Sequence, residues 1–517
     1  FFGSLSSSAN ILMVTMGGTR SHKIPFLALG QGLALRNHSV TLVNAFPENS
    51  ENPDQTRTRN HPRVREITPY GLVMYVRNFT DWDLVGARIR GEDPVPLLDA
   101  IRYGYQVILK RSIKFLSVSD LLLIIDGAYP ECALGLAHHL KVPFMYINTV
   151  GFYTQSLSVL SGYKEIFFDI FEQVHNAALH VACGMLHWIM VRWFLNGVLR
   201  THIHPGTPSA YEISKNVSFI LQNGHSSMTY PRPYLPNVAE VACIHCRPSK
   251  PLPKNIEDFI QRGGNAGFIY VSMGSSKLFL SVFSRLPYQV LWKWDDAIAN
   301  ELLPRNVMQS RWFPQQDLLG HEKIRGFVTH GGLLSLFETI YHGVPVVVLP
   351  VFCDHDANAE KAVRDGYGYR LELRSLTEHK LLSAIINFPI DRFLEQAQKR
   401  SNLLRDQAET PMDTAIFWTE YVLRHRGAYH LQSPAKDMSV IQYYSIDVLL
   451  LMLAAIYSFV IIVNRLRRVA SKLQNTLSYK TKKPKEILKC STSQSKIRGL
   501  ALPSSIYSES RLENEIF

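Results

Sequence analysis

The residues best suited to ligand chemistry lie in the stretch 311–361, around a His-Gly-Gly tripeptide at 330–332. An apolar run at 324–329 precedes the tripeptide, a helix-length segment follows it, and a second apolar run covers 344–351. This order predicts a buried strand, a glycine turn, a helix and another buried strand, which together form a βαβ unit. Glycines before a helix let backbone N–H groups approach a ligand, and the helix N-terminus favours an anion. The stretch therefore predicts a site for a phosphate-bearing ligand.

Two residues able to move or orient a proton follow predicted strands in the N-terminal half. His22 comes after the apolar run 11–16 and before a helix predicted from about residue 23 to 35. Asp126 ends the apolar run 121–125. Open α/β folds bind ligands at the carboxyl ends of their strands, so both side chains are expected at one edge of a sheet. Each also fits a structural role, His22 as a loop histidine and Asp126 as a helix cap.

The elements that would position these residues repeat along two halves of the chain. Strand-length apolar runs in the first half occupy 11–16, 40–43, 121–125, 144–147 and 219–221, and those in the second half occupy 268–272, 290–294, 307–309, 324–329 and 344–351. Helical patterns occupy 23–35, 95–115, 131–140, 378–386, 391–406 and 411–425. Residues 56–65 are polar and predict a surface loop, and the proline-rich 247–254 predicts an extended linker. With 517 residues the chain is long enough for two cores of α/β class.

The net charge of +12 is concentrated in the C-terminal tail. Residues 464–517 carry twelve Lys or Arg against four Asp or Glu, so the charge does not indicate a nucleic-acid-binding surface. The sixteen residues 448–463 before the tail carry no charge. At ~1.5 Å per residue they would span about 24 Å, slightly less than the roughly 30 Å hydrocarbon core of a bilayer. Tyrosines before this run and arginines directly after it predict a transmembrane helix with a cytosolic tail, the alternative being a buried core helix.

Other features agree with a lumenal or extracellular location for the large N-terminal part. Asn37, Asn78 and Asn216 each begin an Asn-X-Ser/Thr glycosylation sequon. The chain begins FFGSLSSSAN without methionine, which we interpret as the end of a secretory signal. Six cysteines are too few for a disulfide scaffold. Cys243 and Cys246 form a lone CxxC, interpreted as loop cysteines or a local disulfide in preference to a zinc or redox site.

With these elements placed, the chain resembles the membrane-bound UDP-glycosyltransferases of animals, particularly invertebrate ones, from Ile11 to about Arg468. The resemblance rests on a signature met by many residues at once: Trp312, Pro314, Gln315, Leu318, Leu319, His330, Gly331, Gly332, Glu338, Gly343, Pro345, Pro350 and Asp354. It implies the GT-B fold, an α/β fold in which two Rossmann-like domains face each other across a cleft, plus one C-terminal transmembrane helix. The implied divisions are an acceptor-binding domain at 1–246, a linker at 247–262, a UDP-sugar-binding domain at 263–436, a membrane-approach and transmembrane segment at 437–463, and a basic cytosolic tail at 464–517.

The resemblance implies a donor site that holds a UDP-sugar along its length. Trp312 would stack on the uracil, Gln315 would read the edge of the base, and Glu338 would accept hydrogen bonds from the ribose hydroxyls. Asp354 would bind the sugar hydroxyls. The diphosphate would be held at a helix N-terminus by Ser275, His330, Gly332 and Ser335. No metal and no further cofactor would be required, because the helix dipole and hydrogen bonds would stabilise the departing UDP.

By the same resemblance, His22 is the general base that deprotonates the acceptor, and Asp126 orients its ring and stabilises the imidazolium. The acceptor atom would attack the anomeric carbon opposite the departing UDP, which inverts an α-linked donor to a β-glycoside. The implied partners are a UDP-sugar, a small lipophilic acceptor and a membrane, with no nucleic acid. The implied location is the endoplasmic reticulum membrane with lumenal catalytic domains. Acceptor identity and self-association stay open.

Three departures from the family pattern bear on the donor and on activity. His355 stands where the family usually has the glutamine that binds sugar hydroxyls, which leaves galactose or a relaxed hexose choice open. Gln222 stands where glucuronate users tend to have an arginine, which favours UDP-glucose over UDP-glucuronate. The segment after Ser275 is too short for the family's usual loop and helix.

These departures leave two alternatives to an active hexosyltransferase. One is a membrane-anchored homologue that binds UDP-sugar but has lost transfer, because a missing helix would uncover the sheet. The other is a nicotinamide-dependent oxidoreductase, suggested by paired Rossmann-like units. The second alternative is disfavoured because no GxGxxG with an acidic residue about 20 positions further on is present.

Overall fold

The computed structural model describes residues 8–15, 20–46, 61–70, 72–74, 84–91, 121–127, 130–149, 178, 181–182, 184–231, 233–273, 277–294, 302–351, 354–386 and 390–487. The chain forms two compact units, Phe1–Lys436 and Asp437–Phe517. The helix predicted at 95–115 and the proposed diphosphate residue Ser275 lie outside the described residues. Of the three sequon asparagines, Asn37 and Asn216 are exposed, and Asn78 lies outside the described residues.

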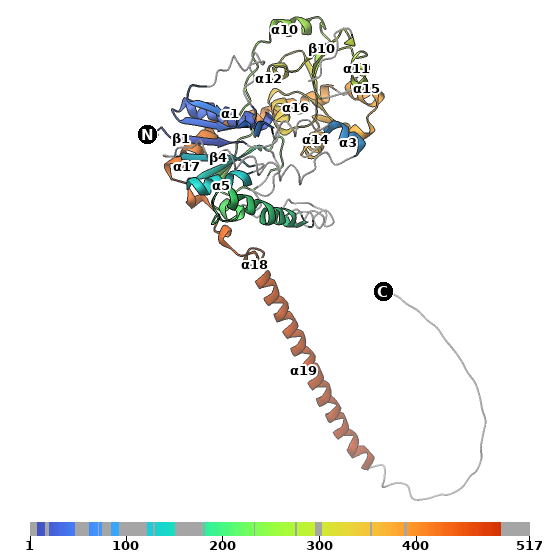
Figure 1. The fold of residues 1–517 in the computed structure, drawn as a ribbon. Helices are drawn as coiled ribbons and strands as arrows, with labels where there is room; N and C mark the ends of the chain where they lie inside the picture. Colours follow the sequence, from blue (N-terminus) through green and yellow to red (C-terminus); the bar gives the residue numbers. More distant parts are fainter. Residues whose placement is uncertain are drawn as a thin grey trace, which may run out of the picture. The chain divides into compact units, whose positions relative to one another are not determined.

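Seven parallel strands form the first sheet of the larger unit (Figure 1). They are β1 (Asn10–Val14), β2 (Ser39–Val43), β3 (Val64–Ile67), β4 (Leu121–Asp126), β5 (Phe144–Asn148), β6 (Phe219–Gln222) and β7 (Val238–Glu240), in the order β3-β2-β1-β4-β5-β6-β7. The five strands predicted from apolar runs are confirmed. The loop predicted at 56–65 is wrong at its end, because Val64 and Arg65 belong to β3, where a single buried valine gives little apolar signal.

Helices cover both faces of the first sheet, which explains why its strands read as continuous apolar runs. On β1, Ile11 and Met13 pack with α1 (Arg20–Leu35) and α17 (Pro411–Arg424). Leu12 and Val14 point the other way and pack with α5 (Glu131–Leu140), α8 (Asn196–His202) and α9 (Ala210–Ser214). The alternation of side chains along a strand thus supplies two apolar cores.

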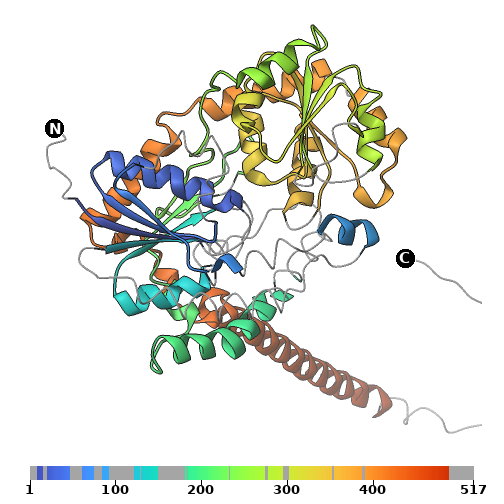
Figure 2. The same cartoon turned by 45° about the horizontal axis from the view of Figure 1, so that its top comes forward.

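Six parallel strands form the second sheet, again between helices (Figure 2). They are β8 (Phe268–Ser272), β9 (Gln289–Lys293), β10 (Val307–Ser310), β11 (Ile324–Thr329), β12 (Val346–Val348) and β13 (Gly368–Arg370), in the order β10-β9-β8-β11-β12-β13. The strand predicted at 344–351 is limited to β12. Pro345 and Pro350 flank it, and proline has no N–H to donate to the ladder.

In the described part of the chain, seven helices surround the second sheet: α10 (Lys254–Gln261), α11 (Lys277–Phe283), α12 (Gln315–Leu319), α13 (Leu333–His342), α14 (His355–Arg364), α15 (Glu378–Ile386) and α16 (Ile390–Arg405). The helix absent from the sequence prediction, α11, is present and covers the sheet. Phe279 and Phe283 of α11 pack on Trp292 of β9, with ring centroids 6.5 and 5.4 Å from the indole. The expected loss of sheet coverage is therefore wrong, because two apolar turns of helix fit in the short segment.

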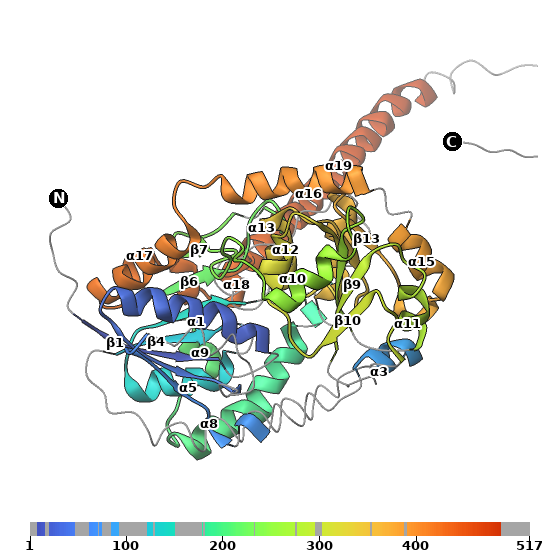
Figure 3. The same cartoon turned by 90° about the horizontal axis from the view of Figure 1, so that it is seen from above.

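The predicted domain boundaries also differ from the packing. The linker expected at 247–262 contains α10, whose Ile256, Phe259 and Ile260 enter the core of the second sheet. The segment assigned to the second domain up to 436 returns to the first sheet at α17 (Figure 3). Trp418 of α17 stacks on Phe219 of β6 at a centroid distance of 4.4 Å. The amphipathic pattern of α17 was visible in the sequence, but it does not reveal which sheet the helix covers.

Polar contacts fix α17 to the first domain and a helix of the first half to the second domain. Glu420 of α17 accepts hydrogen bonds from Arg36 at 3.1 and 3.3 Å and contacts the buried His38 at 3.4 Å. Arg88 of α3 (Leu84–Arg90) pairs with Asp356 of α14 at 2.9 Å and with Glu372 at 3.2 Å. The second half of the chain thus contacts the domain of the first sheet through α17, and the first half contacts the domain of the second sheet through α3.

The smaller unit is dominated by α19 (Ile446–Ile487), which follows α18 (Val440–Tyr443). Its part Ile446–Tyr479 is long and apolar enough to cross a membrane, judged by length and composition, and its apolar side chains are exposed. The helix is longer than the uncharged run because it continues through the cationic residues after 464.

Candidate active site

The predicted site residues gather at the carboxyl ends of neighbouring strands in the two sheets. In each sheet the strand order reverses at one point, between β1 and β4 in the first and between β8 and β11 in the second. Ligands of open α/β sheets bind at such points. His22 follows β1, and Asp126 is the last residue of β4. His22 lies in the first turn of α1 and not in the loop before it, because the helix begins three residues earlier than predicted.

His22, Asp126 and Thr149 form a compact polar cluster. Nδ1 of His22 lies 2.9 Å from Oδ2 of Asp126 and 2.8 Å from Oγ1 of Thr149. The Thr149 hydroxyl donates to Oδ1 of Asp126 at 3.0 Å. Since both oxygens near Nδ1 then act as acceptors, we assign the ring hydrogen to Nδ1. Nε2 is then the nitrogen that carries the lone pair, as a general base requires.

The surroundings of His22 favour its charged form. Its side chain is 12% exposed, while that of Asp126 is 1% exposed. Burial opposes the charge, but the Coulombic attraction and hydrogen bond of Asp126, with a smaller contribution from Asp354, raise the pKa of His22 above 6.5. Asp354 belongs to the domain that contains the second sheet. Its contribution to this shift indicates that the Asp354 carboxylate lies within electrostatic range of the His22 ring.

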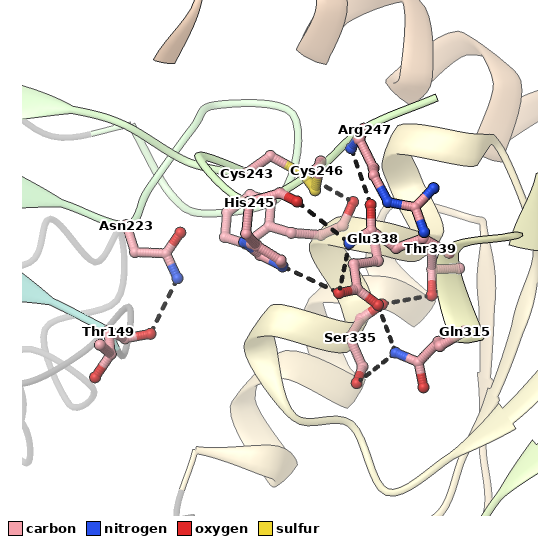
Figure 4. A network of polar contacts seen from close by, with 12 residues as sticks. Thr149, Asn223, Cys243, His245, Cys246, Arg247, Gln315, Ser335, Glu338 and Thr339 are labelled. Carbon is pink, nitrogen blue, oxygen red and sulfur yellow. Dashed lines mark hydrogen bonds and ion pairs between the residues drawn. A yellow bond between two sulfur atoms is a disulfide. The ribbon is translucent and has the colours of Figure 1, made fainter. Parts of the chain in front are cut away.

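Sequence reasoning missed the residues that support this cluster. Thr149 follows β5, and Asn223 follows β6 and donates to the backbone oxygen of Thr149 at 3.0 Å (Figure 4). Thr15, which follows β1, donates to Asp126 at 3.4 Å. All three residues stand just beyond buried strands. The rule that singled out Asp126 would therefore have found them if it had been applied to hydroxyl and amide side chains.

The turn at 330–332 requires its glycines. Gly331 has φ +90°, and a Cβ on it would lie 2.7 Å from the Val348 side chain. Gly332 is the N-cap of α13, and a Cβ there would lie 2.7 Å from Nε2 of His330. The backbone N–H groups at the start of α13 can therefore be approached closely. This geometry agrees with the prediction of an anion site at this helix N-terminus.

Two histidines beside this turn are held neutral. Burial lowers the pKa of His330 to about 4, although a hydrogen bond to the Ser272 backbone opposes the shift. Burial, with a smaller effect of His330, lowers the pKa of His355 to about 2. Their ring centroids lie 4.7 Å apart. This lowered pKa favours the uncharged form of the His355 ring at neutral pH.

Asp354 is tied to the glycine turn by a residue that the sequence did not single out. Asn358 of α14 donates through Nδ2 to Oδ2 of Asp354 at 2.8 Å and to the backbone oxygen of Gly331 at 3.0 Å. Asn358 is buried. One amide group thus sets the position of the predicted sugar-binding carboxylate relative to the predicted phosphate-binding turn.

Gln315, Ser335 and Glu338 also lie close together (Figure 4). Nε2 of Gln315 donates to Glu338 at 2.6 Å and to Ser335 at 3.1 Å, and Oε1 of Gln315 accepts from Tyr270 at 3.3 Å. Trp312 is partly exposed and lies three residues before Gln315. Gln316, which was not predicted, donates to the second oxygen of Glu338 at 3.3 Å.

The CxxC cysteines form a disulfide, Cys243–Cys246, which confirms the local-disulfide interpretation. Among the described residues, no group of three His, Cys, Asp or Glu side chains is arranged to hold a metal ion.

Comparisons with known proteins agree with this architecture. The family described as "UDP-glucoronosyl and UDP-glucosyl transferase" matches residues 110–483. UDP-glucuronosyltransferase 2B19 of Macaca fascicularis is 33% identical over 69% of this chain and 71% of its own length. UDP-glucuronosyltransferase 2B15 of Homo sapiens is 38% identical over 46% of each chain, so the match spans about half of that relative. Among solved structures, TcCGT1 in complex with UDP is similar with a TM-score of 0.55 and 16% identity, over 81% of this chain and 100% of that one. The glycotransferase of kitacinnamycin is similar with a TM-score of 0.53 and 19% identity, over 81% and 99%.

Proposed function

We propose that this chain, which belongs to the UDP-glucuronosyl and UDP-glucosyl transferase family, moves a hexose from a UDP-sugar to a small lipophilic acceptor with inversion at the anomeric carbon. The observation that carries the proposal is the pairing of His22 with Asp126 at a point where Asp354 of the other domain also acts on the imidazole. A base and a sugar-binding carboxylate from separate domains would then meet at one substrate.

In the proposed reaction, Nε2 of His22 takes the proton of the acceptor hydroxyl, amine or thiol. The acceptor atom forms a bond to the anomeric carbon while the bond from that carbon to the UDP oxygen breaks, and the electron pair leaves with UDP. Asp126 stabilises the imidazolium through Nδ1, and Thr149 holds the Asp126 carboxylate in place. Proton transfer by a positioned histidine typically contributes about 10²–10⁴-fold to the rate.

The donor half would bind UDP in the order that the contacts suggest. The N-terminus of α13, with His330, Gly332 and Ser335, would receive the diphosphate, together with Ser275 from outside the described residues. Glu338 would accept from the ribose, Trp312 would stack on the uracil, and Gln315 would contact its edge. Asp354 and His355 would bind the sugar. No metal or further cofactor is included in this proposal.

We favour glucose as the transferred sugar, with glucuronate as the competing choice. A glucuronate carboxylate calls for a cation, whereas His355 is neutral and Gln222 is buried and hydrogen-bonded to Asn148 at 2.7 Å. The named relatives are UDP-glucuronosyltransferases, so the opposite preference has support from the comparisons. For location, the cationic residues that follow the uncharged run 448–463 support a single-pass protein of the endoplasmic reticulum membrane with lumenal catalytic domains.

A donor panel tests the proposed function. The full-length protein in detergent would be given a set of phenols with UDP-glucose, UDP-galactose or UDP-glucuronate, and product would be measured by mass spectrometry with its anomeric configuration by NMR. We expect a β-glucoside, with slower transfer from the other donors. UDP binding without any product would support the homologue that has lost transfer. A β-glucuronide as the main product would overturn the choice of glucose, and absence of UDP binding would overturn both.

A further inference from the structure

A disulfide-closed loop carries a buried histidine to the donor site where the chain passes from the first sheet to the second. The loop follows β7 and is closed by Cys243–Cys246 (Figure 4). Cys243 packs in the core of the second sheet, and its Sγ lies 3.4 Å from the backbone oxygen of Phe337 on α13. This segment, expected to be the end of the acceptor domain, is therefore attached to the helix that carries Ser335 and Glu338.

His245 lies between the two cysteines and faces Glu338 (Figure 4). Its side chain is 2% exposed, and Nε2 lies 3.2 Å from Oε1 of Glu338, the distance of an ion pair. The approach is not aligned as a hydrogen bond, and within the described part of the chain neither ring nitrogen of His245 has a hydrogen-bond partner. Leaving a buried polar group without a hydrogen bond is unfavourable, so this arrangement must be held in place by its surroundings.

The loop's backbone is held from the other side by α12. Nε2 of Gln316 donates to the backbone oxygen of His245 at 3.2 Å and to Glu338 at 3.3 Å, and its Oε1 accepts from the backbone N–H of Arg247 at 2.9 Å. Arg247 also pairs with Asp317 of α12. The disulfide and Gln316 therefore fix the position of the imidazole relative to the Glu338 carboxylate.

We propose that His245 is a positioning residue for the donor nucleoside, held by the Cys243–Cys246 disulfide so that it orients the carboxylate that reads the ribose hydroxyls. The inference rests on the proposed role of Glu338. Gln315 and Gln316 contact one carboxylate oxygen each, and His245 adds a third contact that limits rotation of the group. Without His245, the carboxylate could turn from the orientation that accepts from the ribose.

Binding of UDP and 2′-deoxy-UDP to the full-length protein in detergent, measured by calorimetry, separates positioning from a purely structural role. A lost hydrogen bond to a charged group corresponds to about a 10- to 150-fold preference for UDP in the wild type. We expect His245→Ala to reduce this preference at least fivefold, and His245→Gln, which keeps an N–H donor, to restore most of it. His321→Ala is the matched control, because His321 lies 3.3 Å from Glu257 in the same domain but contacts no donor-site residue named above.

Reduction of the disulfide supplies a second measurement that does not depend on folding of a variant. In the wild type, reductant should lower the preference for UDP, and its removal should restore it, whereas Cys243→Ser should not respond. An unchanged preference in His245→Ala and in the reduced wild type, or equal weakening of both nucleotides, overturns the inference. If Glu338→Ala abolishes the preference in that case, the proposed donor site survives. If the wild type binds UDP and 2′-deoxy-UDP equally, Glu338 does not read the ribose hydroxyl, and the proposed role of His245 fails with it. Sugar transfer itself is tested separately by the donor panel.

Discussion

His22 must be neutral to accept a proton, yet its neighbours favour the imidazolium. The carboxylate of Asp126 raises the pKa of His22 despite burial, and in the proposed mechanism the same charge would stabilise the imidazolium once the acceptor has been deprotonated. Asp126 would therefore have two opposite effects. It leaves a smaller fraction of His22 in the neutral, active form at neutral pH, but it makes the neutral ring a stronger base and stabilises the imidazolium that forms.

The pH dependence of transfer tests that balance. Because His22 acts as a base in the proposed mechanism, kcat/KM is expected to rise with pH through an apparent pKa above 6.5 and then to level off. Asp126→Asn removes the charge that raises the pKa, so the rise should move to lower pH while the plateau falls by about 10²-fold or more. Initial rates over pH 5–9 would show both effects. A profile unchanged by Asp126→Asn would contradict the assignment of Asp126.

Asn358 offers a second residue-scale prediction. Its single amide group joins Asp354 to the backbone of Gly331, so Asn358→Asp should replace two donated hydrogen bonds by repulsion between carboxylates. We expect the KM for UDP-sugar to rise about tenfold, corresponding to roughly 1.4 kcal/mol, with a smaller change in the KM for acceptor. Steady-state kinetics with each substrate varied in turn would check this split. An equal rise in both KM values would show general disruption instead.

At the scale of elements, the sequence predicted what local pattern determines and missed what depends on contacts between distant segments. Buried parallel strands such as β8 and β11 were found because both of their faces are apolar. The short or weakly apolar elements β3, β7, α10 and α12 give no such signal. The site followed the same division: His22 and Asp126 were found from their positions after strands, whereas the contact of His245 with Glu338 joins residues 93 positions apart in the sequence.

The return of α17 to the first sheet predicts an effect on stability. Glu420→Gln would leave the buried His38 and the partly exposed Arg36 without their carboxylate acceptor. We expect the free energy of unfolding to fall by about 1–3 kcal/mol, since a buried donor loses a charged partner while the exposed pair contributes little. Thermal unfolding of the detergent-solubilised protein would measure the change. Glu212→Gln, at an exposed pair with Lys215, is the control and should leave the midpoint unchanged.

At the scale of the whole molecule, the larger unit contains both halves of the proposed transferase, and the smaller unit contains the candidate membrane helix. Strand order reverses at a corresponding point in each sheet, and His22 and Asp126 in the first half and His330 in the second follow or end strands at that point. Residues 464–517 carry twelve Lys or Arg against four Asp or Glu, so positive charge is far denser in this short tail than in the larger unit. A folded unit followed by an apolar helix and a cationic segment fits the proposal that catalysis occurs on one side of a membrane and the cationic segment lies on the other.

The membrane assignment predicts the behaviour of a tagged protein in microsomes. Truncation before Ile446 should release the larger unit from the membrane into the lumenal fraction, because α19 would be lost. In the full-length protein, added protease should remove a tag at residue 517 but leave the larger unit intact. A protected C-terminal tag would contradict the cytosolic position of the tail.

We propose centrally that His22 deprotonates the acceptor, which then attacks a donor bound by the other domain, and one variant tests this most directly. His22→Ala should bind UDP with the same Kd as the wild type, because the proposed donor site lies on the second sheet, while kcat for glycoside formation falls by at least about 10²-fold. Calorimetry and product analysis of the same purified sample would give both values. A His22→Ala protein that retains near wild-type kcat would contradict the account.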